Sequence, residues 1–140
     1  MAKVKVSSIP KQERMELVGD LFDIVYGLKT KTDTIDFLIG LLTPSESLML
    51  ARRIQVAKQL IEGKTYDEIR KNMKVSYNTI NGIEHWMNAR DNAYRRVLAN
   101  WMKRKNQRIR KKEGRADKYE YTGLLDKYPQ HRFLKRLLGL

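Results

Sequence analysis

The chain has 140 residues, of which 41% are hydrophobic, and a net charge of +13, which suits one domain with an extension and a modest core. It contains no cysteine, which excludes disulfides, thiolate chemistry and cysteine-based zinc sites. No apolar run has the length of a membrane span and the first residues do not form a secretory signal, so we expect a soluble, cytoplasmic protein without a membrane partner.

Two helices are predicted before residue 43. Pro10 suits the first turn of a helix over residues 10–28, because apolar residues then recur every three or four positions. They are Met15, Val18, Leu21, Phe22, Val25 and Leu28. After a polar break, a second helix is apolar on nearly every side, with Ile35, Phe37, Leu38, Leu41 and Leu42. A helix that is apolar on nearly every side must be buried against other parts of the protein, and we expect a second subunit to bury it.

A third helix has clear boundaries. Thr43 and Glu46 have the spacing of a capping box, and Pro44 suits the first helical position. The helix should run to Glu62, because Gly63 can end it. Its predicted inner stripe consists of Leu50, Ile54, Ala57 and Ile61.

Residues 65–88 form the segment that we call the reading unit. Thr65 and Glu68 have capping-box spacing, so a short helix should begin directly after Thr65. A turn follows, and Ser76 can cap a second helix that begins at Tyr77. The apolar residues at helical spacing predict a small shared core of Ile69, Met73, Val75, Ile80 and Ile83. This arrangement is typical of a helix-turn-helix.

The second helix of the reading unit should present a polar, uncharged face to solvent. The candidate base-reading residues on it are Ser76, Tyr77, Asn78, Asn81, Gly82 and His85. An Asn amide both donates and accepts hydrogen bonds, which suits adenine in the major groove. We favour DNA reading over a plain helical hairpin. Two residues depart from the usual motif: Arg70 replaces a small residue, and Lys74 replaces the glycine of a left-handed turn, at a cost of about 1 kcal/mol.

A last long helix is predicted from Ala89, and its apolar stripe ends near Met102. Residues 103–118 carry nine basic and two acidic side chains, more than half of the net charge, which indicates a polyanionic partner rather than a solubilising tail. Candidate phosphate-binding cations are Lys103, Arg104, Lys105, Arg108, Arg110, Lys111 and Lys112. Thr65, Tyr66 and Ser76 could bind phosphates at the helix starts.

Residues 119–140 read as a small separate unit that ends in a short helix. Tyr119, Tyr121 and Tyr128 alternate with basic residues, and an apolar stripe follows at 133–138. We favour an arm that docks on the body or on a partner subunit over a surface that stacks bases, since interleaved aromatic and basic residues are weak evidence for single-strand binding.

The order of these motifs resembles the tryptophan-repressor superfamily, and most of all its YerC/YecD-type branch. The matching segments are LLTPSE, ARRIQVAKQLIEG, TYDEI, S-x-x-T-I and W-M-N, within residues 14–102. The resemblance implies an all-α, tryptophan-repressor-like helical bundle and an intertwined homodimer whose joint core comes from the first, second, third and last helices. It implies a transcriptional regulator, more specifically a repressor, that binds double-stranded DNA. Residues 1–102 would be the DNA-binding and dimerisation domain, and residues 103–140 a basic extension.

The same resemblance bears on a cofactor. The tryptophan repressor holds L-tryptophan between two arginines, whose positions map here to Arg53 and Gly82, and a serine that contacts the ligand maps to Trp86. The loss of one cation and the gain of an indole argue against an L-tryptophan corepressor, and we expect no cofactor. Our hypothesis is that Trp86 fills the space of the ligand; the alternative is that it is a core residue.

Other functions have less support. An RNA- or ribosome-associated protein would use the basic C-terminal tail, and a protein-interaction module would leave the charge excess unexplained. An enzyme is not expected, because the sequence has no Gly-rich phosphate loop and no paired carboxylates in an apolar setting. The two histidines, His85 and His131, are far apart in sequence and neither has a partner at i+4, so no metal site is predicted.

Overall fold

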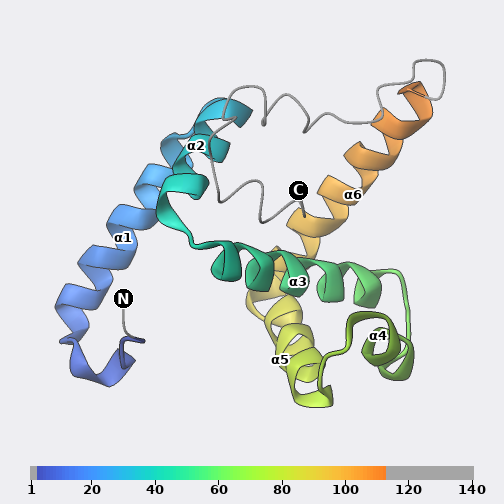
Figure 1. Ribbon diagram of the computed structural model, residues 1–140, viewed down its shortest axis with the longest axis horizontal. Coiled ribbons are helices and arrows are strands. Elements are labelled where there is room, and N and C mark those ends of the chain that lie inside the picture. The colour runs from blue at the N-terminus through green and yellow to red at the C-terminus, as the bar shows by residue number, and fades with distance from the viewer. Residues whose placement is uncertain (1–2, 113–140) are drawn as a thin grey trace. The chain divides into compact units, whose positions relative to one another are not determined.

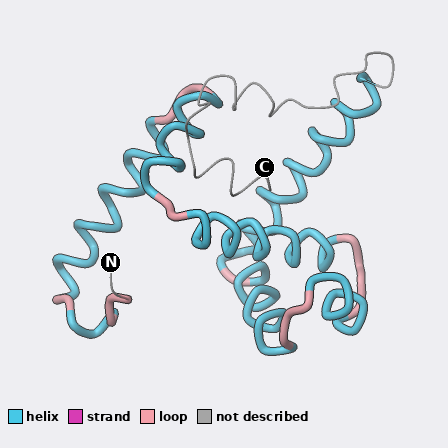
Figure 2. The backbone as a smooth tube through the Cα atoms, in the orientation of Figure 1, coloured by secondary structure: helices cyan, strands magenta, loops and turns pink. Residues whose placement is uncertain are grey.

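A computed structural model describes residues 3–112 of the chain. Six α-helices and two 3-10 helices follow one another in this part (Figure 1), and short loops join them (Figure 2). The described residues contain no strand, so the predicted all-α fold is confirmed. Contacts between residues divide the chain at Leu42 and Thr43 into two compact units.

The first unit contains the 3-10 helix η1 (Val6–Ser8) and the helices α1 (Lys11–Gly27) and α2 (Lys31–Leu41). The Thr30 side chain caps α2 by accepting a hydrogen bond from the Asp33 N–H at 3.0 Å. Neither α1 nor α2 contains a buried residue. The apolar stripe predicted for the first helix therefore lies on the surface of the chain. Its exposed members include Met15, Val18, Leu21, Phe22 and Val25.

The second unit is built on α3 (Pro44–Ile61). It continues with α4 (Tyr66–Met73), α5 (Tyr77–Asn88), the 3-10 helix η2 (Arg90–Asn92) and α6 (Ala93–Lys112). In Figure 1, α3 crosses α5 and the beginning of α6, and it also contacts α4. The helix boundaries predicted for the reading unit are confirmed. The core of the unit consists of Val56, Ala57, Ile69, Ile80, Ile83, Met87 and Leu98.

The predicted inner stripe of α3 is wrong in its first half. Leu50 and Ile54 are 44% and 37% exposed, whereas the buried residues of α3 are Val56, Ala57 and Gln59. The reason is that the elements packed on α3 cover the C-terminal half of the helix. A periodic stripe shows which residues share a face, but it does not show how far along the helix the neighbours extend.

The predicted start of the last helix at Ala89 is also wrong. Ala89 has an extended backbone with φ −76° and ψ 159°, and the next three residues, 90–92, have φ of 49°, 55° and 60°. Right-handed helix cannot pass through such a segment. The last helix therefore begins at Ala93, and the Asn92 N–H donates to the Ala89 carbonyl at 3.2 Å.

Helix α6 crosses residue 102 without a break, so the predicted domain boundary at that point stays a prediction. The tyrosines and the short terminal helix predicted within residues 119–140 lie outside the described residues. Among the helices of the described part, none is long and apolar enough to cross a membrane.

Candidate nucleic-acid interface

Helix α4 begins with a complete capping box. The Glu68 N–H donates to Thr65 Oγ1 at 3.3 Å, and the Thr65 N–H donates to Glu68 Oε2 at 2.7 Å. The hydrogen bond from the Thr65 backbone, followed by that from its side chain, lowers the pKa of Glu68. The Thr65 N–H is therefore occupied, and the Tyr66 hydroxyl donates to Glu84. A phosphate at this helix start would have to displace the Glu68 carboxylate from the Thr65 N–H, or bind the backbone N–H groups of the residues that follow.

The turn between α4 and α5 has a left-handed residue where the sequence predicted one. Lys74 has φ 51° and ψ 50°, and its N–H donates to the Arg70 carbonyl at 2.8 Å. The Arg52 guanidinium, from α3, donates to the Met73 carbonyl at the end of α4. A cation at this position complements the negative end of the helix dipole.

A second connection joins the reading unit to α3. The Asn72 Nδ2 donates to Gln59 Oε1 at 3.1 Å, and Gln59 is a buried polar residue of α3. Its buried amide oxygen therefore has a partner, as a buried polar group requires. Together with the bond from Arg52 to Met73, this contact fastens α4 to α3 at two points.

Helix α5 presents the predicted polar face to solvent. Ser76 caps the helix, because its Oγ accepts a hydrogen bond from the Thr79 N–H at 3.2 Å. Asn78, Asn81 and His85 are exposed, whereas Ile80, Ile83 and Met87 are buried on the opposite side. The amide groups of the two asparagines are thus available to an external partner.

Gly82 lies in the middle of α5, where no neighbouring atom of the described residues requires a residue as small as glycine. A Cβ built at Gly82 would meet no described atom within 4 Å. A glycine in a helix interior costs about 0.5–1 kcal/mol relative to alanine. The open space beside it allows another backbone or a base to approach the helix closely.

Tyr77, predicted as a base-reading residue, has several partners inside the reading unit. Its hydroxyl donates to Asp67, and its ring stacks on that of Tyr66, with 6.2 Å between centroids. The Arg70 guanidinium lies over the ring of Tyr77, 4.2 Å from its centroid. The hydrogen bond with Glu84 raises the pKa of Tyr66, and burial adds to this shift. These contacts fix α4 against the first turns of α5.

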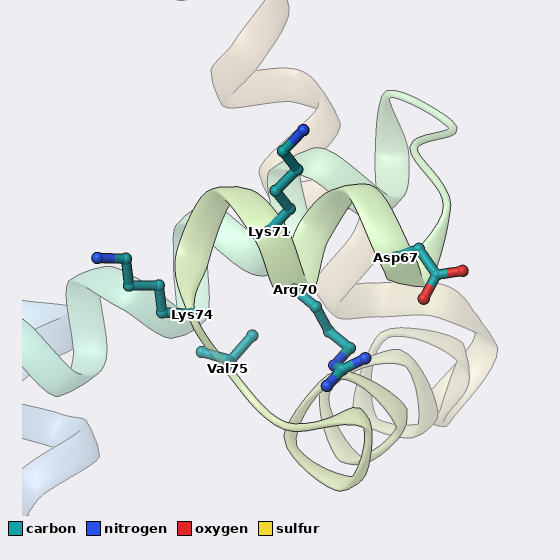
Figure 3. Close-up of a pocket in the computed structure, with 5 residues that line it drawn as sticks. All are labelled: Asp67, Arg70, Lys71, Lys74 and Val75. Atoms are coloured by element: carbon teal, nitrogen blue, oxygen red, sulfur yellow. The ribbon is translucent and has the colours of Figure 1, made fainter.

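An open recess of about 390 Å³ lies beside the turn. It is lined by Asp67, Arg70, Lys71, Lys74 and Val75 (Figure 3). In Figure 3, Arg70 and Lys71 leave α4 on opposite sides, and Lys74 extends in a third direction. No helical period in the sequence groups these cations, because their common position depends on the turn.

The basic segment predicted to bind phosphates continues α6. Its side chains up to residue 110 are exposed: Lys103, Arg104, Lys105, Arg108 and Arg110. The Lys105 Nζ lies 5.1 Å from the centroid of the Trp101 ring. Lys111 and Lys112 belong to the last turn of α6, and their side chains lie outside the description.

Trp86 is half-exposed in the single chain, at 51%, so it is not part of the core that the described residues form among themselves. Whether it fills the space of a ligand or packs in a core shared with a partner stays a prediction. The Arg53 guanidinium lies 5.2 Å from the centroid of the Trp86 ring. An apolar recess of about 450 Å³ adjoins it, lined by Trp86, Ala89, Arg90, Ala93, Tyr94 and Val97. Burial raises the pKa of Tyr94, and the charge of Arg53 opposes that rise. In the described part of the chain, no cluster of acidic residues and histidines could hold a metal ion.

The family model described as Trp repressor protein matches residues 16–102, which is more than half of the chain and includes the whole reading unit. This chain belongs to the Trp repressor family. It is therefore a member of a family of DNA-binding regulators rather than of enzymes. The chain is also 33% identical over 81 residues to the uncharacterized protein YerC of Bacillus subtilis (strain 168), covering 58% of this chain and 78% of YerC. No solved structure matches the chain.

Proposed function

We propose that this protein is a sequence-specific DNA-binding regulator, a repressor that reads the major groove as a homodimer. The observation that carries the proposal is the exposed, uncharged face of α5 on a helix-turn-helix of the Trp repressor family. Asn78, Asn81 and His85 would contact base edges, and Ser76 and Gly82 would lie along the groove.

In-vitro selection of duplexes from a random pool tests this proposal. We expect an enriched inverted repeat with half-sites about one helical turn, roughly 34 Å, apart, because a two-fold dimer presents two identical heads. Structured RNA with the same number of phosphates is the control ligand. Equal affinity for that RNA, or no enriched sequence, would contradict the proposal.

Mutations should distinguish the contacts to base edges from the contacts to phosphates. Asn78→Ala and Asn81→Ala should each cost about 1–3 kcal/mol on the selected site and relax the base preference. Neutralising Lys103, Arg104 and Lys105 should weaken binding to all duplexes alike and reduce its dependence on salt. If the two sets of variants changed specificity and salt dependence in the same way, the proposed division would be incorrect.

The homodimer is supported by the first unit, where α1 and α2 carry many apolar side chains and bury none of them within the chain. Monomeric soluble proteins rarely expose so many contiguous apolar residues. A two-fold partner would cover these faces and bring two reading units to one side of the DNA.

We further propose that the protein acts without an L-tryptophan corepressor. The Arg53 guanidinium already lies over the indole of Trp86, and Gly82 supplies no second cation. Isothermal titration calorimetry with L-tryptophan should show no saturable heat. Clear saturation at micromolar to millimolar ligand would refute this part of the proposal.

A further inference from the structure

Arg70 and Tyr77 form a stacked pair at the first turn of α5, outside the face that we assign to base reading. The guanidinium carbon of Arg70 lies 4.2 Å from the centroid of the Tyr77 ring, within the range of a cation–π contact. The ring itself is held by the hydrogen bond from its hydroxyl to Asp67 and by stacking on Tyr66 at an interplanar angle of 29°. Tyr77 is therefore a fixed platform for the Arg70 side chain.

The Arg70 guanidinium keeps its hydrogen-bond donors available. Arg70 is exposed, and within residues 3–112 its side chain forms no ion pair and no hydrogen bond. A guanidinium carries five N–H donors in a planar fork that fits a phosphate group. Because stacking already restricts the side chain, Arg70 loses less conformational entropy when it binds an anion.

The surroundings of Arg70 are positively charged. It lines the recess beside the turn together with Lys71 and Lys74, which extend in other directions (Figure 3). The two lysines thus add a positive field at the rim, and Arg70 is the cation with a defined orientation. The nearby carboxylate, Asp67, accepts the hydrogen bond of Tyr77.

We propose that Arg70 binds a backbone phosphate of DNA beside the groove that α5 reads, and that Tyr77 is a positioning residue for Arg70 rather than a base reader. This inference rests on the proposed DNA-binding function. It adds a phosphate contact within the reading unit to those assigned to the basic segment of α6.

The test measures the affinity of the full chain for the selected duplex across a range of salt concentrations. Arg70→Gln should weaken binding about tenfold at 0.1 M salt and should lower the slope of log affinity against log salt by about 0.9 for each phosphate that the variant no longer neutralises. Lys58→Gln is the matched control, because it removes the same charge from α3, where Lys58 pairs with Glu62 at 3.7 Å. The control should leave the slope unchanged.

A double-mutant cycle tests the role of Tyr77. Tyr77→Leu should weaken binding without changing the base preference, and should add little to Arg70→Gln, because both substitutions disrupt the same interaction with the phosphate. Tyr77→Phe keeps the ring and its stacking on Tyr66 but loses the hydrogen bond to Asp67, so its affinity should lie between that of wild type and that of Tyr77→Leu. Circular dichroism melting of each variant separates these effects from unfolding.

Phosphate replacement locates the contact on the DNA. A duplex with a neutral methylphosphonate at the contacted position should bind wild type and Arg70→Gln equally. The inference is overturned if wild type binds the duplex and Arg70→Gln has the same affinity and salt slope, or if Tyr77→Leu alters the base preference. Failure of wild type to bind any duplex would overturn the proposed function, and this inference with it.

Discussion

At the scale of single residues, Lys74 has a backbone conformation that glycine adopts more easily than lysine does. It occupies the left-handed region, with φ 51°, where glycine is free of steric cost. The chain keeps a cation there, at the rim of a basic recess. Such a position is consistent with a residue retained for binding rather than for stability.

Replacing this residue tests that interpretation. Lys74→Gly should raise the free energy of unfolding by about 1 kcal/mol, because the left-handed conformation costs an L-residue that much. Lys71→Gly, in the interior of α4, should lower it by about 0.5–1 kcal/mol. Urea unfolding of the full chain measures both. A lower free energy of unfolding in Lys74→Gly would show that the left-handed backbone at Lys74 is not strained.

The hydrogen bond from Tyr66 to Glu84 predicts a loss of stability in alkali. It raises the pKa of Tyr66 in the folded state, so its stabilising contribution is complete below the unfolded value of about 10 and is lost as pH rises through the folded value. Tyr66→Phe should therefore flatten the decline in unfolding free energy above about pH 10.

The comparison is best made in a Tyr94→Phe background, because burial raises the pKa of Tyr94 and gives the same direction of pH dependence. Urea unfolding between about pH 8 and pH 11 provides the measurement. Parallel declines with and without the Tyr66 hydroxyl would show that this hydrogen bond does not stabilise the fold.

At the scale of elements, the short helix α4 depends on its ends and on its neighbours. Eight residues are too few for a stable isolated helix. Its first turn is closed by the capping box of Thr65 and Glu68, and the carbonyl of its last residue, Met73, accepts a hydrogen bond from the Arg52 guanidinium. The orientation of the reading unit therefore depends on α3 as well as on the turn.

Removing the cap should loosen this element. Thr65→Ala should lower the free energy of unfolding by about 1 kcal/mol, because an N-cap side chain satisfies an amide that otherwise has no partner. Thr65→Ser keeps the hydroxyl and serves as the control. Chemical denaturation compares the two; equal stability of the alanine and serine variants would mean that the capping box is not important for the reading unit.

At the scale of the whole molecule, the two units differ in how much they bury. The second unit has a core between α3, α4, α5 and α6, whereas α1 and α2 in the first unit have no buried residue. Exposed apolar residues on α1 include Phe22 at 65%. A partner subunit is the simplest source of the missing cover.

The predicted dimer should be sensitive to this surface. Phe22→Glu should raise the dimer dissociation constant by about a hundredfold or more, since burying one Phe contributes about 1.5–3 kcal/mol and a two-fold interface contains it twice. Gln12→Glu, exposed on the same helix, introduces the same charge. It also removes the hydrogen bond from Gln12 to Glu16, a local change of a few tenths of a kcal/mol that should have little effect on the dissociation constant. Sedimentation equilibrium measures the constant, and a wild type that remains monomeric would contradict the prediction.

Part of the fold followed from the sequence because its causes are local. Capping boxes at Thr43 and Thr65, the cap at Ser76 and the left-handed turn at Lys74 all involve residues within three or four positions of one another. The apolar spacing of α5 likewise identified the buried side of the reading unit, so its exposed polar face could be predicted.

The rest required the tertiary structure. Arg52 reaches a carbonyl 21 residues away, and Arg70 stacks on Tyr77 across a turn, so no periodic pattern indicates either contact. The break at residues 90–92 and the exposure of Leu50 likewise depend on which neighbours are present. Local hydrogen bonds and helical spacing thus determined the helices and their caps. Packing between distant segments decided which side chains are buried and which cations remain available, because that depends on atoms far apart in the sequence.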